Sequence, residues 1–212
     1  MLPEMLLRRV LPRRAATNGA TEVRMTARVY PPEANYESHA EEWFVEALVE
    51  QLPDEAVVFR NQRFTDWRGD READAIVAWP GVGVAVIEIK GGSVSLRDGQ
   101  WWQTGGKSKA IDPVGQARAC KYLLHQYLAG HPRWSRGKLR TAHLVALPTT
   151  VLPDDFTAPD LPRDLVIDKT QIDYAASWIE RALDRAENQP APPSPGDVEL
   201  LVDALAGQAI PQ

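Results

Sequence analysis

The stretch Gly83–Lys90, GVAVIEIK, joins an apolar run directly to two opposite charges. Such a run between turn residues is typical of a central strand. Residues i and i+2 of a strand point to the same face, so Glu88 and Lys90 would project together, about 7 Å apart along the strand, while Ile89 points the other way. A buried charge needs a partner. The pair is either a structural salt bridge at a strand end or part of a site.

A second carboxylate, Asp74, is predicted to lie beside this pair. It begins the preceding strand, 74–79, and the Pro-Gly turn at 80–81 makes the two strands antiparallel neighbours. Asp74 and Glu88 then fall at similar distances from the turn. Adjacent carboxylates repel unless a proton or cation lies between them, and oxygen ligands suit Mg²⁺ or Mn²⁺, with the Ile89 carbonyl as a further oxygen. The alternative for Asp74 is a solvated aspartate at a loop end.

A third carboxylate, Glu41, falls on the apolar face of a predicted helix. This helix begins after the N-cap Ser38 and continues to about Leu48, and Glu41 shares its face with Phe44 and Val45. Glu41 also lies three residues after Ser38, which is the spacing of a capping box. It therefore either caps its own helix or reaches into a site.

An amide, Gln116, falls on the apolar stripe of a second predicted helix, which Asp112 caps and which continues to about residue 128. Cys120 and Leu123 belong to the same stripe. A glutamine in such a place needs a hydrogen-bond partner. It is either a satisfied core amide or a group that holds a phosphate, a water or Lys90.

The remaining patterns complete an α/β fold in which helices flank a mixed β-sheet. They predict a strand at 56–60, a polar loop at 66–71, a hairpin of 93–96 with 100–103, a loop at 104–109, strands at 142–147 and 165–167, and helices at 171–187 and 197–206. We divide the chain into a disordered basic extension over residues 1–30, a core over 31–150, a strand and helix packed on it over 151–189, and a linker with a short terminal helix over 190–212.

The charge along the chain is segregated into blocks. Residues 90–153 carry ten basic and two acidic side chains, a net charge of +8 in a protein whose overall charge is −5. A basic block inside an acidic protein is typical of a surface that binds a polyanion, although chance segregation of surface charge is an equal alternative. The nucleic-acid-binding candidates in this block are the cations Lys107, Lys109, Arg118 and Lys121.

Two absences in the sequence exclude other classes. The single cysteine, Cys120, rules out a disulfide within the chain and a cysteine-rich zinc site. No apolar run reaches the roughly 18 residues that a membrane span needs, so we expect a cytoplasmic protein with no membrane partner.

Four stretches in this order resemble the nuclease-related domain (NERD) family of the PD-(D/E)xK nuclease superfamily: SHAEEWFVEAL, READAIVAWPGVGVAVIEIKGG, GQWWQ and DPVGQARACKYLL. The resemblance covers roughly residues 36–130. It implies a restriction-endonuclease-like fold and places the family's catalytic set on Glu41, Asp74, Glu88, Lys90 and Gln116. The superfamily's Pro-Asp is absent here, since Asp74 follows an alanine.

The resemblance implies a metal-dependent nuclease that cleaves DNA, or else RNA, with Mg²⁺ or Mn²⁺ held by Asp74, Glu88 and the Ile89 carbonyl. It also implies a homodimer as one assembly, and a helicase or ATPase as a fused module or partner, although the sequence has no P-loop. Two alternatives stay open. One is a nucleic-acid-binding module with a nuclease fold and little catalysis, and the other is a protein-interaction domain whose acidic C-terminal block docks a partner.

Overall fold

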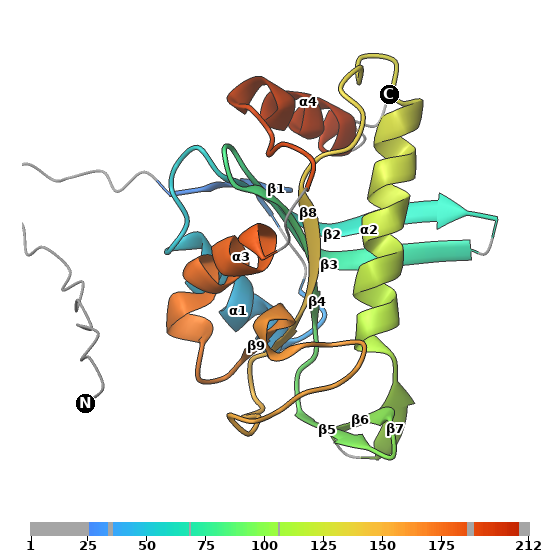
Figure 1. Ribbon diagram of the computed structural model, residues 1–212, viewed down its shortest axis with the longest axis vertical. Coiled ribbons are helices and arrows are strands. Elements are labelled where there is room, and N and C mark those ends of the chain that lie inside the picture. The colour runs from blue at the N-terminus through green and yellow to red at the C-terminus, as the bar shows by residue number, and fades with distance from the viewer. Residues whose placement is uncertain (1–25, 34–35, 68, 106, 186–188, 208–212) are drawn as a thin grey trace, which may run out of the picture.

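The computed structural model describes residues 26–33, 36–67, 69–105, 107–185 and 189–207. A six-stranded sheet lies at the centre, and helices cover both of its faces (Figure 1). In spatial order its strands are β1 (Arg28–Tyr30), β2 (Val57–Asp66), β3 (Gly69–Trp79), β4 (Gly83–Ile89), β8 (Thr141–Leu147) and β9 (Val166–Asp168). The helices are α1 (His39–Val49), α2 (Pro113–Gly130), α3 (Ala175–Asp184) and α4 (Pro195–Leu205).

The sheet is mixed. β2, β3 and β4 are antiparallel neighbours, whereas the pairs β1–β2, β4–β8 and β8–β9 are parallel. Parallel pairs require crossover connections, and α2 provides one on its way to β8. The predicted α/β fold with a mixed sheet and flanking helices is confirmed.

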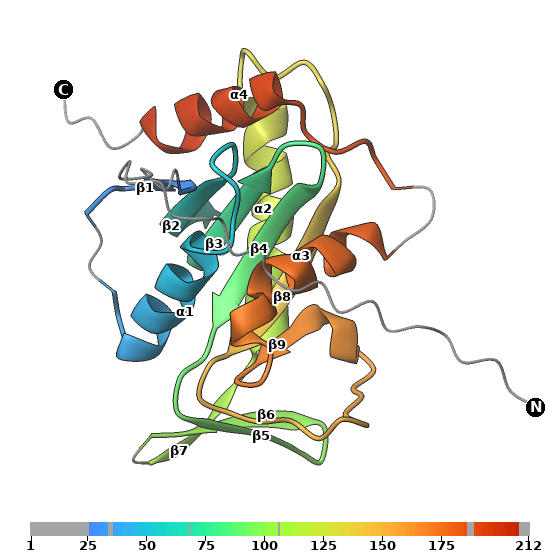
Figure 2. The same ribbon diagram turned by 90° about the vertical axis from the view of Figure 1, so that its left-hand side faces the viewer.

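Residues of the central strands alternate between two separate cores. Ala75 and Val77 of β3 belong to the core beneath α1 and α3, whereas Ile76 and Ala78 belong to the core beneath α2 and α4. The two views show α1 and α3 on one side of the sheet and α2 on the other (Figures 1 and 2). By this period of two, Glu88 of β4 lies on the face that α2 covers, as do Val84 and Val86.

The turn between β3 and β4 is tight, as predicted. Trp79 pairs with Gly83, and Gly81 has a φ of +76°, which a glycine adopts without strain. The last ladder pair of these strands is Ala75 with Ile87. The register therefore brings Asp74 level with Glu88.

The hairpin of β2 and β3 is longer than the sequence predicts. The residues expected to form a polar loop at 66–71 mostly continue the two strands, which pair as far as Asp66 and Gly69. Polar cross-strand contacts hold this extension: the Thr65 hydroxyl donates to Asp70 at 2.7 Å, and Arg63 pairs with Glu72 at 2.6 Å. The hairpin extends beyond α2 in Figure 1.

A second, three-stranded sheet follows β4. It comprises β5 (Ser93–Arg97), β6 (Gln100–Thr104) and β7 (Ser108–Ile111). The predicted hairpin is confirmed, but the loop expected at 104–109 is wrong because Ser108 begins β7. Trp101 of β6 is buried, and its ring centroid lies 5.8 Å from that of Phe156, so it packs in the core.

Both ends of the described chain contact the main sheet, the first as a strand and the last as a helix packed on it. The disordered extension predicted through residue 30 is wrong for Arg28–Tyr30, which form β1 and pair with β2, while residues 1–25 lie outside the described part. The helix predicted over 171–187 is shorter, because a 3₁₀ turn at Ile172–Tyr174 precedes α3. α4 buries Val198 and Leu201 in the core that it shares with α2. Across the described ranges, the helices are too short or too polar to span a bilayer.

Candidate active site

A cavity of about 190 Å³ lies where β4 ends, between the β2–β3 hairpin and the first turns of α2. Asp74, Glu88, Lys90 and Gln116 line it together. Four of the five residues assigned to catalysis by sequence are therefore brought to one place. Asp74 comes from β3, Glu88 from β4 and Gln116 from α2, so the site depends on the tertiary fold.

Asp74 is tied to the backbone of β4. Its Oδ2 accepts a 2.6 Å hydrogen bond from the N–H of Ile89. The next amide, that of Lys90, donates in the other direction to Ala146 of β8 at 2.9 Å. An extended residue presents its N–H and C=O to the same side, so the Ile89 carbonyl faces the Asp74 side of the strand.

Glu88 and Lys90 form the ion pair that their spacing predicts. Lys90 Nζ lies 2.5 Å from Glu88 Oε1, and the Glu88 side chain is only 2% exposed. Its other oxygen, Oε2, is buried and accepts no hydrogen bond. Within the described ranges no other carboxylate oxygen is buried in this way, because the buried Glu41, Asp168 and Asp197 all bond to donors. An acceptor left without a partner in a dry site is costly, which indicates a missing ligand.

The two carboxylates resist ionisation. The pKa of Asp74 is raised to about 8, mainly by burial and then by the charge of Glu88, while the Ile89 N–H and the charge of Lys90 oppose the rise. Burial also raises the pKa of Glu88, and the charge and hydrogen bond of Lys90 offset part of that rise. Burial and mutual repulsion are the expected causes of such shifts in neighbouring carboxylates.

Lys90 is a cation at neutral pH. Burial alone would lower the pKa of Lys90, but the charge and hydrogen bond of Glu88, with the charge of Asp74, outweigh burial and raise it above its ordinary value. A protonated ammonium cannot act as a general base. It can only donate hydrogen bonds and stabilise negative charge.

Glu41 lies at the start of α1 and does not line the cavity. The N–H of Glu41 donates to Ser38 Oγ at 3.3 Å, and its own carboxylate accepts from the Ser38 hydroxyl at 3.2 Å and from the N–H of Glu37 at 3.0 Å. The capping interpretation is therefore the one that the hydrogen bonds support. Its charge still acts on the site, because it contributes to the pKa shifts of Asp74, Glu88 and Lys90.

Gln116 is exposed toward the cavity, so the interpretation as a core amide is wrong. The stripe assigned to it by sequence holds for Cys120 and Leu123, but Gln116 lies at its solvent end. Cys120 is buried at the back of the cavity, and its thiol donates to the Glu72 carbonyl at 3.3 Å. Burial raises the pKa of this thiol to about 12, so it is not a nucleophile.

The four basic candidates lie outside this cavity. Lys107 and Lys109 are exposed at the edge of the small sheet, just before and within β7. Arg118 lines a neighbouring cavity on α2, and Lys121 lies further along the same helix, with its Nζ 3.2 Å from Nδ1 of His143.

The sequence analysis does not identify Arg71, which also lines this cavity. Arg71 was assigned to the polar loop at 66–71, whereas it belongs to β3 and pairs with Phe64 of β2. Its neighbours Asp70 and Glu72 are also charged, so the sequence has no local signal that singles it out.

The residues of this cavity fit a divalent cation. In the described parts of the chain, no three or more His, Cys, Asp or Glu side chains gather closely enough to hold a metal by themselves. Two carboxylates and one carbonyl are a set of hard oxygen donors, which suits Mg²⁺ or Mn²⁺ because these ions keep several waters. The orphaned Glu88 Oε2 is the atom that such an ion would satisfy.

Comparison with known proteins agrees with this geometry. Residues 37–148, just over half of the chain, match the nuclease-related domain. The match includes α1, β2–β8 and α2, and therefore every residue of the cavity. Neither the curated proteins nor the solved structures gave a match. The chain belongs to the nuclease-related domain family.

Proposed function

We propose that this protein is a metal-dependent nuclease that hydrolyses DNA phosphodiester bonds in the cavity formed by Asp74, Glu88 and Lys90. The observation that carries the proposal is the buried and unbonded Oε2 of Glu88, beside a second carboxylate and a lysine ammonium. A purely structural salt bridge would leave neither an orphaned oxygen nor a second carboxylate with a raised pKa.

Asp74, Glu88 Oε2 and the Ile89 carbonyl would hold the ion, Mg²⁺ or Mn²⁺. When bound, such an ion neutralises charge on the scissile phosphate and lowers the pKa of a coordinated water. The Ile89 N–H holds the Asp74 carboxylate in place through the 2.6 Å hydrogen bond, so this ligand is oriented before the ion arrives.

Lys90 supplies the fixed positive charge of the site. Its ammonium lies 2.5 Å from Glu88 Oε1, which positions it beside the reacting phosphate with two further N–H donors available. It orients the attacking water and stabilises the extra negative charge of the pentavalent transition state. A group of this kind contributes about 10²–10³ in rate.

Gln116 and Glu41 act around this centre. Gln116 is exposed in the cavity and is free to donate to a phosphate oxygen or to the water. Glu41 contributes its charge from outside the cavity, and a contact with the ion through a water remains a prediction. The homodimer and the helicase or ATPase partner also remain predictions.

The test is a cleavage assay with Mg²⁺ or Mn²⁺ on plasmid, linear duplex and single-stranded DNA. Lys90→Ala should lower the rate about 10²–10³-fold, and Glu88→Gln should abolish metal-dependent cleavage. Lys169→Ala is the matched control, because Lys169 is an exposed lysine that does not line the cavity. Wild-type protein that binds DNA but cleaves none of the three substrates would favour the binding module instead.

A further inference from the structure

A pocket of about 320 Å³ lies between α2 and the start of β8. Lys121 and His125 line it from α2, Lys138 from the segment that follows α2, and Thr141 from β8. Among the described residues, no aspartate or glutamate lines it. It shares neither Asp74 nor any other lining residue with the catalytic cavity. We call it the α2–β8 pocket.

The two lysines of this pocket have no carboxylate partner. Lys121 Nζ lies 3.2 Å from Nδ1 of His143 and 5.3 Å from the centroid of the Tyr122 ring, and neither group carries a negative charge. The ion pairs of the described ranges include neither Lys121 nor Lys138. The positive charge that these two side chains bring to the pocket is therefore not neutralised by the described part of the chain.

Other cations in this region do have partners on the chain. Arg140, just before β8, pairs with Asp184 at 3.6 Å, and Arg185 pairs with Asp164 at 2.7 Å. The carboxylates of both pairs are thus already beside a guanidinium. This contrast distinguishes the two lysines of the α2–β8 pocket from the arginines around it.

His143, which contacts Lys121, is surrounded by positive charge. Burial lowers the pKa of His143 to about 4, and the charges of Lys121, Arg118 and Arg185 lower it further. Burial and the charge of Arg118 likewise lower the pKa of Lys121. No negative charge opposes these shifts, so an anion beside Lys121 would relieve the repulsion.

His125 senses both lysines of the pocket. Its Nε2 lies 2.8 Å from the Thr141 hydroxyl, and its pKa is lowered by burial and then by the charges of Lys121 and Lys138. The two ammonium groups come from separate elements, yet both act on this one ring. They are therefore placed to bind the same ligand.

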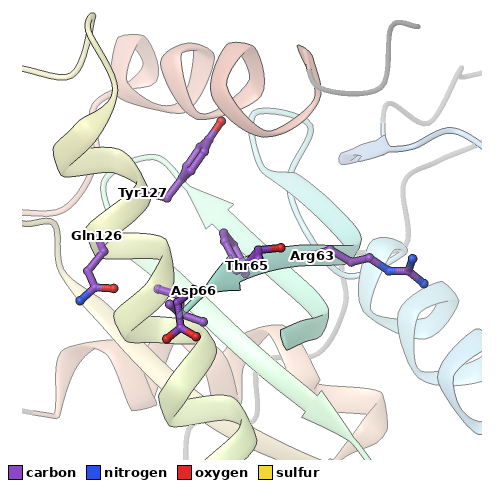
Figure 3. Close-up of a pocket in the computed structure, with 7 residues that line it drawn as sticks. Arg63, Thr65, Asp66, Gln126 and Tyr127 are labelled. Carbon is purple, nitrogen blue, oxygen red and sulfur yellow. The ribbon is translucent and has the colours of Figure 1, made fainter. Parts of the chain in front are cut away.

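The hollow on the other side of α2, beside the β2–β3 hairpin, has a different character. It measures about 440 Å³, and Asp66 faces Gln126 across it (Figure 3). Of the described residues that line it, only Arg63 is a cation, and Arg63 points away from Gln126 and pairs with Glu72. A hollow with unpaired cations and no carboxylate is thus not a general feature of the α2 surface.

We propose that the α2–β8 pocket binds a phosphate group, with the ammonium groups of Lys121 and Lys138 as its counter-charges. Two donors on separate elements suit an anion with several acceptor oxygens, and lysine binds phosphate as a point charge. Two sources present this group: the backbone of a nucleic acid, and a free phosphate or nucleotide. The inference goes beyond the proposed nuclease function and does not depend on it, because the pocket and the catalytic cavity have no lining residue in common.

The test is a titration with sodium phosphate in EDTA at pH 7 and constant ionic strength, followed by NMR of the histidine ring protons. The resonances of His125 and His143 should shift and saturate. A pH titration with phosphate bound should show the pKa of His143 raised from about 4, because a nearby anion favours the imidazolium. His39 is the internal control, since its side chain is 93% exposed at the start of α1.

Two substitutions test the lysines. Lys121→Gln and Lys138→Gln should each weaken phosphate binding about 10- to 100-fold, the range for loss of one charged hydrogen bond. Lys169→Gln should not, because Lys169 is an exposed lysine that does not line the pocket. Lys121→Gln should leave Tm unchanged or raise it, because the substitution removes a charge that lies among like charges. Lys138 is exposed, so its variant tests the pocket even where Lys121→Gln unfolds.

An unmoved His143, an equal shift with sodium chloride, or wild-type phosphate affinity in both lysine variants would overturn the inference. A short single-stranded oligonucleotide in EDTA then identifies the source of the phosphate. Binding that shifts His143 and is weakened by Lys121→Gln assigns the pocket to a nucleic-acid backbone, whereas a response to inorganic phosphate alone assigns it to a free phosphate or nucleotide. Since EDTA prevents metal-dependent cleavage, failure of this inference leaves the proposed nuclease standing, and loss of the nuclease leaves the pocket.

Discussion

The carboxylate of Asp74 accepts a 2.6 Å hydrogen bond from the backbone N–H of Ile89. An ionisable side chain thus takes the place of the next backbone hydrogen bond between β3 and β4. The pKa of this carboxyl is raised to about 8, mainly by burial and then by the charge of Glu88. In the metal-free protein the charged form of Asp74 is therefore disfavoured, and its free-energy cost can be measured as a loss of folding stability.

Asp74→Asn should stabilise the metal-free protein at neutral pH. Between about pH 4 and pH 8 the unfolded chain loses the Asp74 proton while the folded chain retains it, so wild-type stability falls as the pH rises through this window. Asparagine does not titrate. The gain should be absent near pH 4, grow to at least about 1 kcal/mol by pH 8, and raise Tm by roughly 2–4 °C.

Thermal unfolding in EDTA across this pH range is the measurement. Asp155→Asn serves as control, because Asp155 is exposed and remote from the cavity. A variant that gained nothing over wild type at pH 8 would contradict the raised pKa.

Breaking the Glu88–Lys90 pair should cost more stability than removing both of its charges. Lys90→Met leaves the Glu88 carboxylate buried without its counter-charge, which should cost about 3–5 kcal/mol. The double variant Lys90→Met, Glu88→Gln should recover most of this loss but none of the cleavage. Urea unfolding of the two single variants and the double variant gives the coupling, and additive effects would argue against a direct pair.

Mg²⁺ or Mn²⁺ should stabilise the wild-type protein. An ion at 100 times its Kd adds about 2.7 kcal/mol, or roughly 5–10 °C in Tm for a protein of this size, and EDTA should reverse the shift. Glu88→Gln should remove it, because this substitution takes away the orphaned carboxylate oxygen. A shift that persists in Glu88→Gln would place the ion elsewhere.

Asp168 should behave as a structural counterpart to Glu88. It is fully buried in β9, but its two oxygens accept hydrogen bonds from Leu152, Thr170 and Arg163 at 2.7–3.1 Å. Asp168→Ala should cost about 3–5 kcal/mol, since it leaves those donors unpaired. At temperatures where the variant is folded, its response to Mg²⁺ should match that of wild type in a thermal-shift titration, and loss of that response would refute the assignment.

The features that the sequence predicted well are local ones. The Pro-Gly turn and the two-residue period of the strands place Asp74 level with Glu88 without any knowledge of the rest of the chain. The spacing of Glu88 and Lys90 likewise predicts their ion pair. When a tight turn joins two strands, the turn itself sets their register.

The sequence analysis does not predict features that depend on contacts between residues far apart in the chain. The outer half of the β2–β3 hairpin has few apolar residues, because cross-strand pairs such as Arg63 with Glu72 hold it instead of a core. β1 is only three residues long and is defined by its pairing with β2. Gln116 lies on the predicted stripe but is exposed toward the cavity, and the sequence does not show where along the helix the packed contact with the sheet begins.

The two cores described above extend well past the end of the family match at residue 148. Ile179 of α3 fills one core and Leu201 of α4 the other, and the side chain of Gln51 bridges α1 to the start of α3 through the Ile172 carbonyl and the Ala176 amide. A chain cut at residue 148 would therefore leave part of each core exposed to solvent. The smallest piece that keeps both cores covered has to include the chain through α4. The folding unit therefore extends beyond the residues that match the family.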